Sequence, residues 1–190
     1  MKIDLTYPLT RERLENWRIN SKDKGLMSLG HIGTHFDAMG KTFPLEYSEC
    51  RGVIFDVSRI AADRDIELAD LDAEKICADD FVLIRTGTSE RYEYGSEDYS
   101  TYFPQLSWNL IEFLVAKKIR IIGIDMRGLR KGAEHPKADK FCADKDTFVI
   151  ENLINLDKIV LTGTEIFKVH TYPLNLVGFD GIPCRVIAEV

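Results

Sequence analysis

Residues 30–41 contain the side chains best suited to chemistry, because two of the four histidines of the chain lie there beside a carboxylate. His31 and His35 are four residues apart, Asp37 follows two residues later, and Gly33 lies between the histidines. Imidazole nitrogens and carboxylate oxygens are ligands that suit zinc, manganese and iron. The composition therefore indicates a metal site with His31, His35 and Asp37 as candidate ligands.

The spacing of these three residues limits the backbone that could bring them to one ion. In an extended strand they would share a face, but about 13 Å would separate the two imidazoles at roughly 3.3 Å per residue. In a helix Asp37 would fall about 240° further round than His31, and Gly33 followed by Thr34 disfavours a helix. The remaining solution is a bent strand or turn, folded at Gly33, that wraps the donors around one point.

Apolar runs elsewhere predict the elements that position this stretch. Strands are expected at 3–7, 52–57, 66–68, 81–87, 119–125, 147–150, 159–162 and 181–188. One short helix begins after Thr10, and another begins after Ser107 with an apolar stripe through 110–115. The order strand, helix, strand over 81–125 is typical of an α/β domain, and the length fits one domain over 1–190.

Several polar segments lie between these elements. The strand at 147–150 delivers Glu151 at its end, and the polar segment 126–146 contains His135 and Asp139. Four tyrosines in 88–103 either anchor that connection or line a substrate pocket, and anchoring is favoured. Residues 20–25 are interpreted as a surface loop or a lid.

Composition excludes several classes of protein. The formal net charge of −6 and the pI of about 5.3 argue against a nucleic-acid partner. The N-terminus has no apolar signal core, and no run approaches the roughly 18 apolar residues of a membrane span, so a soluble cytoplasmic protein is expected. The four scattered cysteines fit reduced, buried thiols better than disulfides.

Six short blocks occur along the chain in a recognisable order. They are Asp4-Leu5-Thr6, His31-x-Gly33-Thr34-His35-x-Asp37-Ala38, Leu83-Ile84-Arg85-Thr86-Gly87, Gly123-Ile124-Asp125, Ile150-Glu151-Asn152-Leu153-x-Asn155-Leu156 and Asp180-Gly181-x-Pro183-x-Arg185. Together they resemble the putative cyclase family, which contains bacterial kynurenine formamidase and isatin hydrolase. The second block is the most specific, and the six cover nearly the whole chain.

The resemblance implies a single α/β domain of the swivelling β/β/α type, with a mixed sheet, flanking helices and assembly as a homo-oligomer, commonly a dimer. It implies metal-dependent hydrolysis of an N-formyl or cyclic amide in a small-molecule substrate. In such proteins the residues matching His31, His35 and Asp37 hold a divalent ion, here zinc or manganese, and the match to Glu151 holds a second ion or orients the catalytic water. The alternative is an altered or inactive member that binds metal and a small ligand.

Two positions depart from the family pattern, which usually has histidine where this chain has Lys41 and Asp139. Lys41 is expected in the auxiliary role, as a clamp on a carboxylate or as a general acid, and the clamp is preferred. If Lys41 faces Asp139, an ion pair worth about 4 kcal/mol before desolvation would replace the second ion. Otherwise Asp37, Asp139 and Glu151 form a second site of oxygen donors.

One ion per chain is favoured, because a lysine ammonium would oppose a second cation. His135 is four residues before Asp139 and could supply the missing imidazole. A surface role for His135 is favoured.

Overall fold

The computed structural model describes residues 1–20, 26–60 and 64–190. The predicted loop or lid at 20–25 therefore lies, except for Asn20, outside the described residues. Helices are α1 (Arg11–Asn20), α2 (Leu26–Leu29), α3 (Thr88–Arg91), α4 (Glu97–Thr101), α5 (Trp108–Ala116), α6 (His135–Ala143) and α7 (Leu156–Leu161). Strands are β1 (Lys2–Asp4), β2 (His35–Asp37), β3 (Glu49–Asp56), β4 (Phe81–Arg85), β5 (Ile121–Ile124), β6 (Phe148–Glu151), β7 (Ile166–Pro173) and β8 (Gly181–Glu189).

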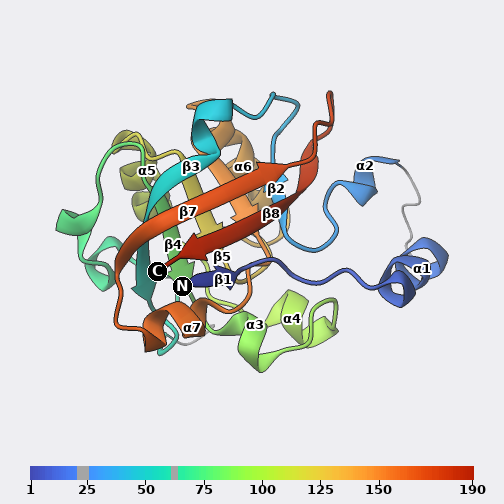
Figure 1. The fold of residues 1–190 in the computed structure, drawn as a ribbon, viewed down its shortest axis with the longest axis horizontal. Coiled ribbons are helices and arrows are strands. Elements are labelled where there is room, and N and C mark those ends of the chain that lie inside the picture. Colours follow the sequence, from blue (N-terminus) through green and yellow to red (C-terminus); the bar gives the residue numbers. More distant parts are fainter. Residues whose placement is uncertain (21–25, 61–63) are drawn as a thin grey trace.

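The eight strands form one mixed sheet that closes on itself. Their order is β1-β8-β2-β6-β5-β4-β3-β7, and β7 also pairs with β8. Strands β3, β4, β5 and β6 run parallel, whereas β2, β7 and β8 pair with their neighbours antiparallel. In Figure 1 the long β7 and β8 cross the front, while α5 and α6 lie behind the sheet. The sheet and its flanking helices confirm the predicted α/β fold class.

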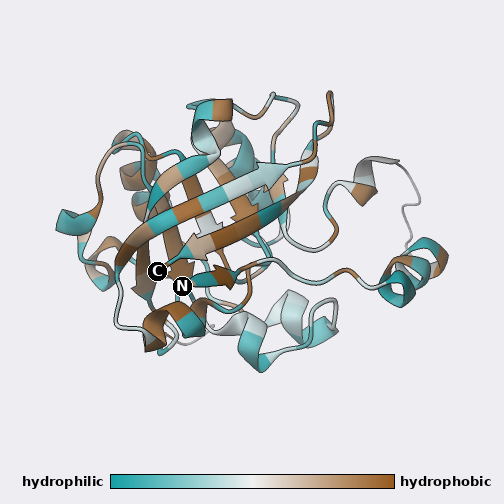
Figure 2. Ribbon diagram, viewed as in Figure 1, coloured by the Kyte–Doolittle hydropathy of each residue, from teal (hydrophilic) through white to brown (hydrophobic). Residues whose placement is uncertain are grey.

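Alternation along the parallel strands divides the core between two faces of the sheet. Val82 and Ile84 join the cluster that packs under α5 and α6, whereas Phe81 and Leu83 point into the closed side of the sheet. Figure 2 shows β4 and β5 as almost continuously apolar, which is typical of strands buried on both faces. This rigid centre holds the ends of β4, β5 and β6, where the polar residues of the candidate site begin.

Most of the predicted elements are present. Thr10 Oγ1 accepts a hydrogen bond from the backbone N–H of Arg13 at the start of α1, and Ser107 Oγ accepts one from Leu110 at the start of α5. The predicted strand at 66–68 is wrong, because Ile66 forms only an isolated bridge with Leu106 and a 3-10 turn follows.

The predicted strand at 159–162 is also wrong. This run lies in α7 and the turn after it, and Leu156 and Ile159 bury one face of that helix. Leu156 and Ile159 are three residues apart, which places them on one face of a helix. Burial of this face outweighs the preference of the β-branched residues in the run for a strand. Helix α6 was missed, because the polar segment 126–146 shows little apolar periodicity.

In the described ranges no helix is both long and apolar enough to cross a membrane. Cys50, Cys142 and Cys184 are buried free thiols as expected, whereas Cys77 is exposed, because it lies in the irregular connection before β4.

Candidate metal centre

The histidine stretch is bent at the predicted glycine. Gly33 has φ +64°, and the chain before it turns while the chain after it enters β2. The His31 and His35 ring centroids are consequently 4.9 Å apart, instead of the roughly 13 Å of an extended strand. His31 lies at the surface with 41% of its side chain exposed, whereas His35 and Asp37 are 2% exposed.

Asp37 joins the two imidazoles. Its Oδ1 lies 3.2 Å from His31 Nδ1 and 3.3 Å from His35 Nε2. One ligand atom from each of the three residues fits within 4.8 Å of the others, which is close enough for one ion. The structure thus brings together the three residues that their spacing selected.

A second group of three possible ligands lies beside the first. His135 and Asp139 are one turn apart on α6, and their closest atoms, Nε2 and Oδ2, are 3.2 Å apart. Glu151 ends β6, and its Oε1 is 2.8 Å from His135 Nε2. This group also fits within 4.8 Å. The surface role preferred for His135 is therefore wrong, because α6 turns its ring inward to Glu151.

Strand register connects the two groups. In the antiparallel pair of β2 and β6, His35 lies directly opposite Glu151, so that their side chains share a face. His35 Nε2 is 3.6 Å from Glu151 Oε2. A cavity of about 240 Å³ opens over this point, lined by His31, His35, Tyr94, Gly95, Tyr99, Ser100, Arg127, His135, Glu151 and Asn152.

The hydrogen bonds of His35 leave one of its ring nitrogens directed at the carboxylates. Nδ1 donates to the carbonyl oxygen of Gly33 at 2.9 Å, because a carbonyl can only accept. In the neutral ring, Nε2 therefore presents a lone pair toward Asp37 and Glu151. His35 Nε2, Asp37 Oδ2 and Asp139 Oδ1 are buried atoms without a hydrogen-bond partner among the described residues. A divalent cation at each donor group would satisfy these atoms, so the residues present fit bound metal.

The pKa shifts of His35, Asp37 and Asp139 also indicate that the site favours a bound positive charge. Burial alone would lower the pKa of His35, but the carboxylates of Asp37 and Glu151 raise it to about 9. Burial and the nearby charges of Asp37 and Glu151 raise the pKa of Asp139. Burial would raise the pKa of Asp37 too, but His35 and His31 hold it far below its ordinary value. The pocket thus stabilises a cation, either a proton or a metal ion.

Lys41 does not contact Asp139, in contrast to the ion pair considered from the sequence. Its ammonium donates hydrogen bonds to the carbonyl oxygen of Ala143 and to Asp146 Oδ1, the latter at 2.9 Å. This position at the C-terminal end of α6 is favourable for a cation, because unpaired carbonyl groups and the helix dipole are negative there. Asp139 is left to face His135. The catalytic role of Lys41 stays a prediction.

Tyrosines form one wall of the cavity and also anchor their loop. Tyr94 Oη accepts the backbone N–H of Gly33 at 2.7 Å, and Tyr99 donates to Asn152 Oδ1 at 2.7 Å. Asn152 Nδ2 in turn donates to the Gly33 carbonyl oxygen at 3.0 Å. The two roles considered for these tyrosines are thus combined, and the loop clamps the bend that places His35.

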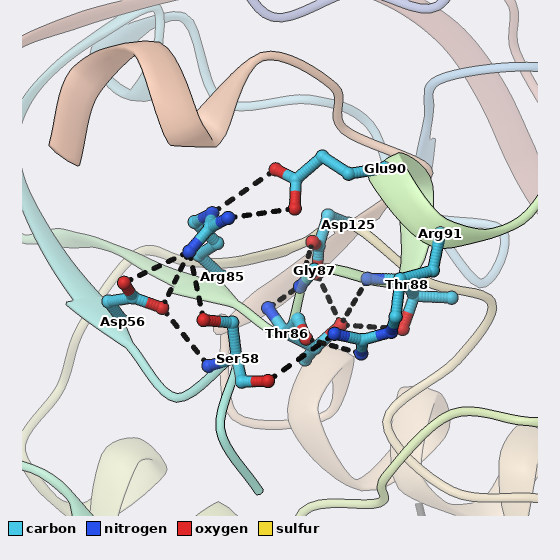
Figure 3. A network of polar contacts seen from close by, with 9 residues as sticks. All are labelled: Asp56, Ser58, Arg85, Thr86, Gly87, Thr88, Glu90, Arg91 and Asp125. Atoms are coloured by element: carbon cyan, nitrogen blue, oxygen red, sulfur yellow. Dashed lines mark hydrogen bonds and ion pairs between the residues drawn. The ribbon is translucent and has the colours of Figure 1, made fainter. Parts of the chain in front are cut away.

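A buried carboxylate, that of Asp125, holds the start of the segment that carries these tyrosines. Asp125, at the end of β5, accepts hydrogen bonds from the backbone N–H groups of Thr86 and Gly87 at 2.8 and 2.7 Å. It also accepts the Thr86 hydroxyl at 2.6 Å. Figure 3 shows Asp125 next to Thr86 and Gly87, with Arg91 reaching back from α3 to the Thr86 carbonyl oxygen. Asp125 therefore fixes the start of the tyrosine loop.

A neighbouring arginine secures the outer side of the same turn. Arg85 forms ion pairs with Asp56 and Glu90 at 2.9 Å each, so that it links β3 to α3. These contacts are part of the network drawn in Figure 3. The position of α3 is consequently set by charged and buried polar contacts on both sides.

We expect the contribution of Asp125 to stability to depend on pH. Burial raises its pKa to about 6, although the hydrogen bonds oppose the rise. Because the folded pKa exceeds the unfolded value of about 3.8, this contribution is complete below pH 4 and is lost as pH rises through 6. Urea unfolding should show that the stability advantage of wild type over Asp125→Asn shrinks by about 1.5 kcal/mol from pH 5 to pH 8. A difference that stays constant over this range would contradict the assignment.

Because Gly128 has no side chain, the His135 ring can pack directly against its backbone. A Cβ at Gly128 would lie 2.9 Å from His135 Cδ2 and Nε2 and from the carbonyl oxygen of Arg130, and its φ is +78°. Gly178 has φ +79° with nothing within 4 Å of the same added atom. Substitution by alanine at either position incurs the left-handed backbone cost, but only at Gly128 does it also push on His135.

We therefore expect both variants to lower the free energy of unfolding. The decrease should be larger for Gly128→Ala than for Gly178→Ala, and the difference should be about 1 kcal/mol or more. The His135 imidazole resonances in an NMR spectrum should shift in Gly128→Ala and stay in place in Gly178→Ala. Equal stabilities with an unmoved imidazole would show that the ring is not held by this contact.

Comparison with known proteins gives one family and a set of related structures. The family model described as putative cyclase matches residues 3–129. No curated protein matches the sequence. A solved structure of a potential metal-dependent hydrolase with cyclase activity is 26% identical, with a TM-score of 0.74 and coverage of 99% of this chain and 96% of that chain.

Two further structures resemble the chain over nearly its whole length. A predicted metal-dependent hydrolase from Bacillus stearothermophilus is 25% identical, with a TM-score of 0.73 and coverage of 99% of this chain and 97% of that chain. Isatin hydrolase A from Labrenzia aggregata has the same fold with a TM-score of 0.78 at 20% identity, with coverage of 100% and 93%.

Proposed function

Since the chain belongs to the putative cyclase family, we propose that it is a metal-dependent hydrolase that cleaves an N-formyl or cyclic amide in a small molecule. The observation that supports this proposal most directly is the pair of adjacent donor groups around the buried His35. Three carboxylates and three imidazoles converge there, and neither a lysine ammonium nor an arginine guanidinium pairs with these carboxylates among the described residues.

We assign two neighbouring ion positions to the site. His31, His35 and Asp37 would hold the first ion, and His135, Asp139 and Glu151 the second. One ion was favoured from the sequence because a Lys41 ammonium beside the second site would oppose another cation, but that ammonium contacts Ala143 and Asp146 instead. Without that charge the second group keeps its attraction for a cation. Mixed nitrogen and oxygen donors suit zinc or manganese.

A bound divalent cation supplies hydroxide at neutral pH and polarises a carbonyl group. The protein's own part is to place the substrate and its proton donors. Tyr94 Oη accepts the Gly33 N–H, so the phenol proton remains free for an acceptor in the cavity, such as the carbonyl oxygen of an amide. Glu151 would help to hold the second ion, and its carboxylate at the cavity wall could also orient the attacking water. The buried walls of His35 and Tyr99 limit the water in the cavity.

Hydrolysis of a substrate panel tests the proposal. Protein loaded with zinc or manganese is incubated with N-formyl arylamines, cyclic amides and lactones, and release of acid is measured. Hydrolysis of an amide that stops on chelation and returns with added metal is expected. Metal binding without hydrolysis of any substrate would instead support the alternative, a member of the family that binds metal and a ligand but has lost activity.

Assembly is proposed on the same footing. We propose a homo-oligomer, a dimer or larger, by analogy with the family; the cytoplasmic location stays a prediction from the sequence. Sedimentation of the purified chain at several concentrations tests the proposed assembly.

A further inference from the structure

A second cavity adjoins the candidate metal centre. It has a volume of about 400 Å³ and shares Ser100, Arg127 and His135 with the first cavity. Its other lining residues are Thr101, Phe103, Arg130, Lys131 and Gly132. A molecule bound at the metal centre could therefore extend past His135 into this space, which we call the basic pocket.

Three cations line the basic pocket, and one of them is already neutralised. Arg130 pairs with Asp65 at 2.5 Å and with Glu134 at 2.7 Å. Arg127 has neither an ion pair nor a hydrogen bond from its guanidinium within the described part of the chain. The Lys131 ammonium lies 4.6 Å from the centre of the Phe103 ring and likewise has no ion pair there. Two uncompensated positive charges thus face the pocket.

The two positive charges of Arg127 and Lys131 lie beside a site rich in carboxylates, in a protein that is acidic as a whole. The chain carries a net charge of −6, and the neighbouring metal centre is formed partly by the carboxylates of Asp37, Asp139 and Glu151. A free arginine that lines both cavities provides the opposite sign of charge at their junction. Burial raises the pKa of Tyr94 and Tyr99, and the Arg127 charge opposes that rise in both, which places the guanidinium close to the tyrosine wall.

We propose that the basic pocket binds a carboxylate group of the substrate, with Arg127 as the principal contact and Lys131 as the second. This inference rests on the proposed function and adds the substrate class, an amide that also carries a carboxylate away from the scissile bond. A guanidinium presents two parallel N–H donors that match the two oxygens of a carboxylate. The Ser100 side chain provides a further polar group at the shared wall.

Matched substrates separate this contact from the hydrolytic reaction. The ortho, meta and para isomers of N-formylaminobenzoate differ from formanilide only by a carboxylate. For wild type we expect at least one isomer to have a higher kcat/KM than formanilide. In Arg127→Gln that preference should fall about 10- to 100-fold, through an increase in KM, since a charge-assisted hydrogen-bonded contact is lost. Lys131→Gln should give a smaller fall.

Lys137→Gln is the matched control. Lys137 is exposed on α6 and lines neither cavity, but its substitution removes the same charge from the same region. The preference for the carboxylated substrate should be unchanged in this variant. Equal preference in wild type and Arg127→Gln, or an equal loss in Lys137→Gln, would overturn the proposal.

Binding of benzoate, followed by NMR, gives a readout that does not require hydrolysis. Amide resonances of 100–103 and 127–132 should shift on titration in wild type, and Arg127→Gln should weaken the apparent affinity at least about tenfold. If no formanilide or N-formylaminobenzoate is hydrolysed but this binding is present, the carboxylate site holds and the amide reaction fails. Unchanged binding in Arg127→Gln would refute the site.

Discussion

Replacement of His35 by alanine is expected to remove the first ion position and to reduce metal-dependent hydrolysis by at least about 100-fold. His35 Nε2 lies 3.3 Å from Asp37 and 3.6 Å from Glu151, so its loss affects both groups of ligands. In the metal-free protein the same change leaves two buried carboxylates without their nearest cation. Breaking such a contact typically costs about 3–5 kcal/mol, so the variant should also be less stable.

His170→Ala is the control for this variant. His170 lies on β7 and contacts Glu189 and Glu49, outside the candidate site. Metal content, hydrolysis and the free energy of unfolding should be measured for both variants. Retention of wild-type metal content by His35→Ala would mean that His35 is not a ligand.

Replacement of His135 by alanine should remove the second ion position and leave the first. Its Nε2 is shared between Glu151 and Asp139, at 2.8 and 3.2 Å. We expect metal affinity at that position to fall about 100-fold, with a comparable loss of activity. Lys41→Ala, which removes a contact at the far end of α6, should change the metal content little.

A compensating change makes this second prediction sharper. The resemblance noted in the sequence predicts that relatives have histidine at the position of Asp139, one turn after His135 on the same helix face. In the His135→Ala background, Asp139→His should therefore restore the second ion, because the imidazole approaches Glu151 from the neighbouring turn. If Lys41→Ala lowers metal content as much as His135→Ala, or if the compensating change has no effect in an otherwise folded protein, the assignment of His135 fails.

The sequence was most informative where ligand spacing and backbone geometry restrict each other. His31, His35 and Asp37 can meet at one point only through a bend, and Gly33 is the residue that allows it. Glu151 was placed correctly at the end of a strand, and the pairing of β2 with β6 then brings it opposite His35. Strong apolar runs such as 81–85 located the parallel strands for the same local reason.

The residues that were misplaced depend on contacts that local sequence does not encode. The Lys41 ammonium contacts the C-terminal end of α6, a helix that begins 94 residues later at His135. This helix could not be anticipated, because its segment is polar and shows little apolar periodicity. His135 and Asp139 do have the spacing of neighbours on one helix face, which was the available signal for their joint role. The basic pocket likewise exists only because the segments around Ser100 and Arg127 meet in the fold.

Metal content of the purified chain tests the central claim most directly. The protein is treated with a chelator, dialysed against zinc or manganese and then freed of unbound ions. Its metal content is measured by elemental mass spectrometry, with His35→Ala and His135→Ala treated in parallel. Two ions per chain are expected for wild type, in line with the adjacent sites of two-metal hydrolases. One ion is expected for His135→Ala. A wild-type protein that takes up neither metal would contradict the account.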